Sequence, residues 1–161
     1  MKSGDILFVH YRFDPVGWLI RRAINCKYNH VAWILNKSTL IEAKGGGITL
    51  NPINKFSNKL FYKTKLMRIK DISTLDLNVS LYFALIRCQK TNRFKIFITF
   101  LLIFLGYKGK YPRPTCSGII AESLSQVGFY FNKRKKPKNI TPKDILKSRR
   151  LYEVCDINTC I

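Results

Sequence analysis

The sequence predicts an α+β fold in which helices gather around an antiparallel sheet. Short apolar segments separated by turn residues precede Asp71, a pattern typical of strands joined by hairpins. After Asp71 the apolar residues recur at helical spacing. The chain has 161 residues, 47% of them hydrophobic, which is enough to bury one core. We therefore expect a single domain over residues 1–161.

The first part of the chain is expected to alternate between strands and turns, with one short helix. GDILFV predicts a buried strand, and Asp14 and Pro15 then predict the N-cap and first position of a helix whose apolar residues form one stripe. A turn at 37–39 and the glycines at 45–47 predict hairpins between the strands that follow. These strands are expected at 30–35, 39–43, 47–52 and 59–69.

The second part is expected to be mainly helical. SLYFALIRC and the apolar run 96–105 predict two helices or one broken helix, and a further helix is expected from about Ser117 to Val127, closed by Gly128. The segment ITPKDILKS predicts a last short helix, whose start resembles a capping box. The segment LYEV predicts a final strand.

The run 96–105, IFITFLLIFL, has two interpretations. Ten residues are too few to span a bilayer as a helix, so we expect a buried core helix. The alternative is a segment that dips into a membrane interface, because basic residues flank it on both sides.

The chain is strongly basic, with 29 Lys and Arg residues against nine Asp and Glu residues and a net charge of +20. Such a charge attracts polyanions, which include nucleic acids, anionic lipid headgroups and acidic cell walls. The basic run KRKKPK at 133–138 is expected to be a solvated loop. Because no aromatic residues interleave with basic ones in a base-reading motif, sequence-specific nucleic-acid binding is not expected.

The N-terminal segment and the cysteines favour a cytoplasmic protein. Peripheral association with a membrane is a further expectation. The apolar run ILFV near the N-terminus is too short for a secretion signal, and five cysteines are an odd number. Two histidines and the closely spaced Cys155 and Cys160 do not complete a zinc set. We therefore expect no metal and no cofactor.

Cys116 is the first candidate for chemistry. It lies in TCSGIIAES, directly before a predicted helix. A thiol at a helix N-terminus faces unpaired backbone N–H groups and the positive end of the helix dipole, which favour the thiolate and can stabilise an oxyanion. Many buried cysteines share such a position, so the local sequence leaves a structural role open.

His30 is the candidate base, and Glu42 is its candidate partner. His30 opens the predicted strand HVAWIL, and Glu42 lies twelve positions later in the next strand. In an antiparallel hairpin the two residues meet at one end of the strands. A carboxylate beside an imidazole fixes its tautomer and stabilises the imidazolium. The alternatives are that Glu42 lies on an exposed strand face and that His10, the only other histidine, is the base.

These segments resemble the circularly permuted NlpC/P60 papain-like superfamily, in its YiiX/YaeF-like and lecithin:retinol acyltransferase-like branch. NHVAWILNKSTLIEAKGGGI matches the His-bearing strands, which precede the Cys-bearing helix matched by TCSGIIAESLSQVG. The resemblance covers most of the chain and is weakest over 72–105. It implies a permuted papain-like fold with Cys116 as nucleophile, His30 as general base and Glu42 as orienting residue.

The resemblance also implies a tyrosine before the cysteine, close to the oxyanion. Tyr107 and Tyr111 are the candidates, although Pro112 stands where the family usually has an aspartate after the tyrosine. Ser117 is a further candidate for contact with the oxyanion or the substrate.

The implied activity is that of a cysteine hydrolase or acyltransferase that cleaves an amide, ester or thioester bond. The basic charge and the apolar run 96–105 favour a lipid-linked substrate at an anionic membrane, and peptidoglycan peptides are the alternative within the superfamily. A non-catalytic binder of membrane or nucleic acid is the competing class. The affinity of such a binder should fall steeply with salt.

Overall fold

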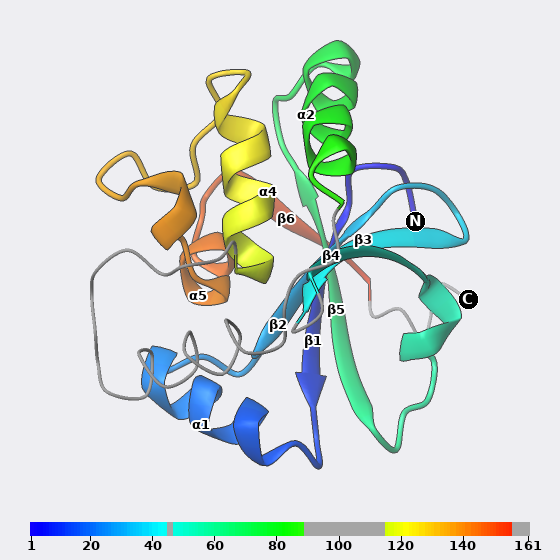
Figure 1. Ribbon diagram of the computed structural model, residues 1–161. Coiled ribbons are helices and arrows are strands. Elements are labelled where there is room, and N and C mark those ends of the chain that lie inside the picture. The colour runs from blue at the N-terminus through cyan, green and yellow to red at the C-terminus, as the bar shows by residue number, and fades with distance from the viewer. Residues whose placement is uncertain (45–46, 89–114, 156–161) are drawn as a thin grey trace.

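The computed structural model describes residues 1–44, 47–88 and 115–155, which form an α+β fold around a six-stranded antiparallel sheet (Figure 1). The order of strands in the sheet is β4-β3-β2-β1-β5-β6. The strands are β1 (Ile6–Tyr11), β2 (His30–Ile34), β3 (Thr39–Lys44), β4 (Gly47–Pro52), β5 (Tyr62–Ile69) and β6 (Leu151–Cys155). The coarse fold class predicted from the sequence is therefore confirmed.

Each helix of the described residues begins directly after a polar N-cap residue. The Asp14 side chain accepts a hydrogen bond from the Val16 N–H, and the Ser73 hydroxyl accepts one from the Asp76 N–H. The helices are α1 (Pro15–Ile24), α2 (Thr74–Ile86), α4 (Cys116–Ser125) and α5 (Pro142–Leu146), with short 3₁₀ turns η1 (Ile53–Phe56) and η2 (Pro137–Asn139).

Several sequence predictions differ from the structure or fall outside it. Helix α4 ends at Ser125, with Gln126 as its C-cap, rather than at Val127 before Gly128. Helix α2 begins before the predicted SLYFALIRC because Ser73 caps it earlier. Strand β5 begins at Tyr62 rather than at 59, because the N–H groups of Phe61 and Tyr62 bond to the Asn58 carbonyl in a turn. The helix predicted over 96–105 lies outside the described residues.

The sheet has a hydrophobic cluster on each face. Alternating residues of β1 and β2 supply both clusters: Phe8 and Trp33 belong to one, and Leu7 and Ile34 to the other. Helices α2 and α4 complete the first cluster, whereas η1 covers the second. Because both faces are covered, the central strands are almost continuously apolar.

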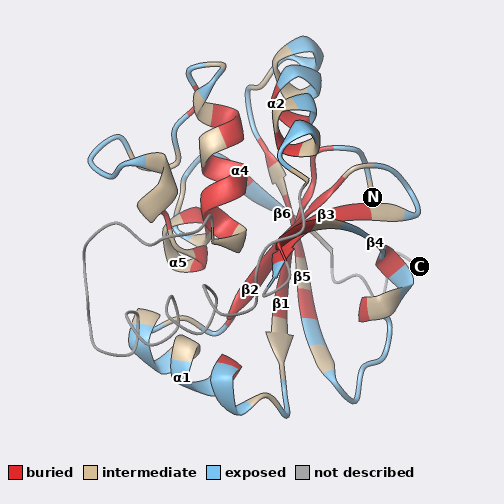
Figure 2. Ribbon diagram, in the orientation of Figure 1, coloured by how far each residue is buried: buried red, intermediate tan, exposed pale blue. Residues whose placement is uncertain are grey.

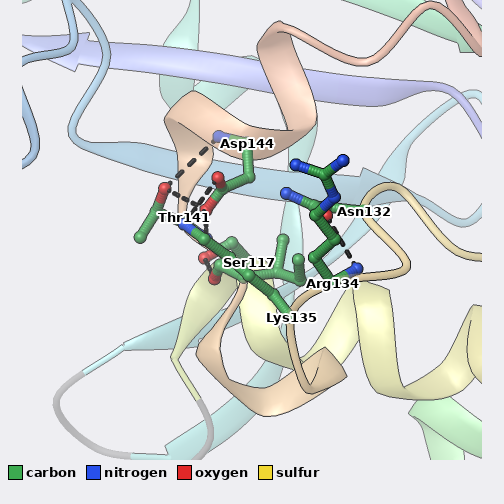
Figure 3. A network of polar contacts seen from close by, with 7 residues as sticks. Ser117, Asn132, Arg134, Lys135, Thr141 and Asp144 are labelled. Carbon is green, nitrogen blue, oxygen red and sulfur yellow. Dashed lines mark hydrogen bonds and ion pairs between the residues drawn. The ribbon is translucent and has the colours of Figure 1, made fainter. Parts of the chain in front are cut away.

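Helix α4 packs between the sheet and a small C-terminal layer. Figure 3 shows Ser117, at the start of α4, beside Thr141, the N-cap of α5, and Asp144 of α5. The Ser117 hydroxyl donates to the Ile140 carbonyl at 2.6 Å, and Thr141 and Asp144 form a reciprocal capping box. Lys135 of the basic run pairs with Asp144 at 2.7 Å. The Ser117 bond ties the first turn of α4 to the C-terminal layer, and the other contacts lie within that layer.

Candidate active site

The three candidate catalytic residues come from the ends of three elements. His30 is the first residue of β2, Glu42 lies near the end of β3, and Cys116 is the first residue of α4. Helix α4 contacts both of these strands. Residues far apart in the sequence are therefore brought to one end of the sheet (Figure 1).

His30 and Glu42 form a buried pair. Strands β2 and β3 pair with Trp33 opposite Ile41 and Ile34 opposite Leu40. Continued along the strands, this register makes His30 a diagonal cross-strand neighbour of Glu42 on the same face of the sheet. The His30 Nε2 and Glu42 Oε2 atoms lie 2.9 Å apart, and both side chains are buried.

Glu42 is surrounded by positive charge. Besides His30, it contacts the ammonium groups of Lys55, from η1, and of Lys44, whose Nζ atom lies 3.4 Å away. Burial alone would raise the pKa of Glu42, but these partners, with His30 first, lower it to about 2. Glu42 is therefore ionised at neutral pH and can hold a charged imidazole.

The Cys116 thiol faces the imidazole of His30 and is only partly exposed. Burial acts to raise the pKa of Cys116, but the charge of His30, a hydrogen bond with it, and the backbone N–H groups of Val31 and Ser117 lower the pKa below its ordinary value. Burial acts to lower the pKa of His30, but Cys116 and Glu42 raise this pKa above its ordinary value. Each of the two groups therefore stabilises the charged form of the other.

The two ring nitrogens of His30 have different tasks. Nε2 faces the Glu42 carboxylate, so Nδ1 is the nitrogen left for the thiol. His30 therefore lies between the Cys116 thiol, whose pKa it lowers, and the Glu42 carboxylate, which can stabilise a charged ring.

The local sequence around Cys116 sets its position on α4. Thr115 is the N-cap, and its hydroxyl accepts a hydrogen bond from the Gly118 N–H at 3.0 Å. A Cβ atom at Gly118 would lie 2.8 Å from the Thr115 Oγ1 atom and 3.1 Å from the Lys138 carbonyl oxygen. Glycine is therefore needed because the backbone of the following loop approaches the first turn of α4 closely.

Tyr11 is a site residue that the sequence analysis missed. Its ring lies edge-on to the His30 ring at 5.8 Å, and the Lys44 Nζ atom lies 5.0 Å from its centre. Its hydroxyl oxygen is buried and has no hydrogen-bond partner among the residues that the structure describes. Burial and then the negative charges of Glu42, Tyr62 and Cys116 raise its pKa far above the ordinary value, so the phenol keeps its proton. In the sequence, only its position directly after the first apolar segment indicates that Tyr11 lies near the site.

The other candidates lie elsewhere. His10 follows the opposite face of β1 and lines a cavity beside α1, where burial and Arg21 lower its pKa. The Ser117 hydroxyl is bonded to the Ile140 carbonyl, and only the Ser117 N–H faces the thiol. Tyr107 and Tyr111 lie outside the described residues.

No cluster of three or more His, Cys, Asp or Glu residues suited to a metal ion occurs within 1–44, 47–88 and 115–155. Across the same ranges, every helix is too short or too polar to cross a membrane. A comparison with protein-family models and a comparison with curated proteins both give no match to this chain.

Proposed function

We propose that this protein is a cysteine-dependent hydrolase or acyltransferase with a circularly permuted NlpC/P60 papain-like fold. The observation that carries the proposal is the cluster of thiol, imidazole and carboxylate formed by Cys116, His30 and Glu42, in which the pKa of the thiol is lowered and that of the imidazole is raised. Such opposed shifts in one site are what covalent catalysis by a thiolate requires.

Each step of the reaction uses these side chains. The Cys116 thiolate attacks the carbonyl carbon of an amide, ester or thioester, and a carbon–sulfur bond forms. As the tetrahedral intermediate collapses, the bond to the leaving group breaks, and His30 gives its proton to that group. Neutral His30 then takes a proton from water or another acceptor, which attacks the acyl-enzyme and releases Cys116.

The oxyanion needs hydrogen-bond donors, and two are available. Backbone N–H groups at the start of α4 provide the first. The Tyr11 hydroxyl is our choice for the second, because it is protonated, buried, without a partner among the described residues and next to His30. Tyr107 and Tyr111, which lie outside the described residues, stay predictions for the same role.

The charge of the whole chain favours one substrate class. A net charge of +20 favours acyl groups carried on anionic lipids, with the enzyme in the cytoplasm and associated peripherally with membrane. Peptidoglycan peptides are the alternative, because the same triad cleaves an amide. A purely structural basic binder accounts less well for an ionised Glu42 and a thiol with a lowered pKa in one buried cluster.

An active ester tests the proposal without knowledge of the natural substrate. On mixing with p-nitrophenyl acetate, we expect a rapid stoichiometric burst of nitrophenolate, followed by slower turnover. Peptide mapping of acid-quenched protein should find the acetyl group on Cys116. Absence of a burst, or acetylation spread over several cysteines, would contradict the proposal.

A further inference from the structure

Helix α1 and the turn before β5 are mostly exposed (Figure 2), and several of their exposed side chains are apolar and form one surface. The Phe13 and Phe61 rings lie 6.1 Å apart, so the segment that leads into α1 joins the turn before β5 in this surface. We call it the docking face, and its apolar members, each at least 40% exposed, are Phe13, Val16, Trp18, Leu19, Leu60 and Phe61. A contiguous apolar surface on a folded chain marks a place where a partner binds.

Basic side chains surround the docking face. Positions 12–27 and 58–63 contain six Lys or Arg residues and a single acidic residue, Asp14, which is already used as the cap of α1. The Arg22 guanidinium lies 5.8 Å from the centre of the Trp18 ring. A cavity of about 330 Å³ opens beside Trp18 and is lined by Arg21, Arg22 and Lys27. The face therefore matches a partner that is apolar inside and anionic at its surface.

The aliphatic members of the face decide between a bilayer and a nucleic acid. Aromatic rings with nearby arginines could stack on bases. Val16, Leu19 and Leu60 have no ring to stack, and they gain only by leaving water for an apolar phase. Aromatic and aliphatic side chains together with a basic border suit the headgroup layer of an anionic membrane.

We propose that the docking face binds an anionic phospholipid bilayer, with its aromatic side chains at the level of the headgroups and its basic side chains on the lipid phosphates. This inference rests on the proposed function, which associates the enzyme with membrane, and it deepens that function by naming the surface that binds; the binding itself requires no thiol. Tyr11 directly precedes the docking face and contacts His30, so a bilayer bound there would lie next to the candidate site.

Tryptophan fluorescence tests the proposal, because the chain has two tryptophans in different surroundings. Trp33 is buried, whereas Trp18 is 53% exposed. The full chain carrying Cys116→Ser is mixed with vesicles of phosphatidylcholine alone or with phosphatidylglycerol. We expect a blue shift with the anionic vesicles only, at least about tenfold weaker binding at high salt, and quenching by brominated acyl chains. The Trp18→Phe variant should lose the shift yet still sediment with vesicles.

Matched variants assign the binding to this face. Phe13→Ala combined with Phe61→Ala should weaken vesicle binding by about tenfold or more. Leu75→Ala on α2, where Leu75 is 72% exposed, and Lys133→Gln with Arg134→Gln in the basic run should leave it within about twofold. Circular dichroism and the Trp33 emission verify folding.

Three results would overturn the proposal. The first is an unchanged Trp18 emission with anionic vesicles. The second is loss of vesicle binding in the 133–134 variant but not in the Phe13 and Phe61 variant. The third is a docking-face variant that loses binding to single-stranded DNA but keeps binding to vesicles. Each of them leaves the ester burst in solution unaffected, so failure here is distinct from failure of the proposed activity.

Discussion

Helices α1 and α4 have the same length of ten residues and the same kind of polar N-cap, yet they have opposite surroundings. Seven residues of α4 are buried, whereas Gly17 is the only buried residue of α1. Helix α4 lies between the sheet and the C-terminal layer, and α1 lies beyond the end of β1 (Figure 2). Capping and periodicity therefore suffice to form a helix, but its position relative to the sheet decides which of its side chains are buried and which are exposed.

Helix α1 is attached to the site through polar contacts rather than by burial of its apolar stripe. An Arg21 amino group donates to the Tyr11 carbonyl at 2.9 Å and to the Asn29 side chain at 3.2 Å. A Cβ at Gly17 would lie only 2.4 Å from the Asn29 Nδ2 atom. Helix α1 therefore supports Tyr11 and the start of β2 from outside, whereas α4 carries the proposed nucleophile.

The largest difference between the two helices should appear in chemistry. Replacing the thiol at the start of α4 by Cys116→Ser should lower the rate of p-nitrophenyl acetate turnover by about 10³-fold or more, because nucleophile and base act as one unit. Stopped-flow absorbance measures the burst. Cys26→Ser, just beyond the end of α1, is the matched control and should keep the wild-type rate; equal rates in the two variants would remove the distinction.

The next effect concerns stability. Leu124→Ala in α4 removes a fully buried side chain and should lower the free energy of unfolding by about 2–5 kcal/mol. Leu19→Ala in α1, where the side chain is 40% exposed, should change it by about 0.5 kcal/mol or less. Urea unfolding followed by circular dichroism gives both values. Similar losses would mean that the apolar stripe of α1 is buried in solution.

A smaller effect is expected from the residue that α1 supports. Tyr11→Phe should lower ester turnover by about 10²-fold, since one donor to the oxyanion is lost. Alkylation of Cys116 by iodoacetamide has no oxyanion, so its rate should stay at the wild-type value. If alkylation slows as much as turnover does, Tyr11 acts on the thiolate instead.

The smallest expected effects are those of pH. Because the pKa of Cys116 is lowered, its alkylation rate should reach a plateau at a pH below 9.0, the ordinary pKa of a thiol. The rate at Cys88, whose pKa is raised by burial, should still be rising there. Quenched labelling with peptide mapping across pH separates the two sites. Parallel profiles for the two cysteines would show that His30 does not stabilise the thiolate.

Acid should act on stability through Glu42. Its pKa is depressed from 4.5 to about 2, so its contribution to stability is present above pH 4.5 and is lost as the pH falls towards 2. In Glu42→Gln this part of the acid dependence should be missing, although the variant is less stable at neutral pH. Urea unfolding at several pH values tests this, and identical acid profiles would contradict it.

The hairpin half of the candidate site could be predicted from the sequence, because its contacts are local. A short turn between strands fixes the register, and the register makes His30 and Glu42 neighbours. The cap Thr115 and the closely packed Gly118 likewise reveal how α4 starts. Lys55 and Tyr11 could not be predicted, because they reach the site from η1 and β1, and their approach depends on how the sheet and its covering layers pack.

The strands, the capped helices and the pairing of an imidazole with a carboxylate follow from the order of residues alone, since these features depend on residues close together along the chain. The tertiary structure alone decided that the Cys116 thiol meets His30 and that the apolar stripe of α1 faces outward. Both outcomes depend on the position of a helix against the sheet, which is set by packing between distant segments rather than by the residues of the helix.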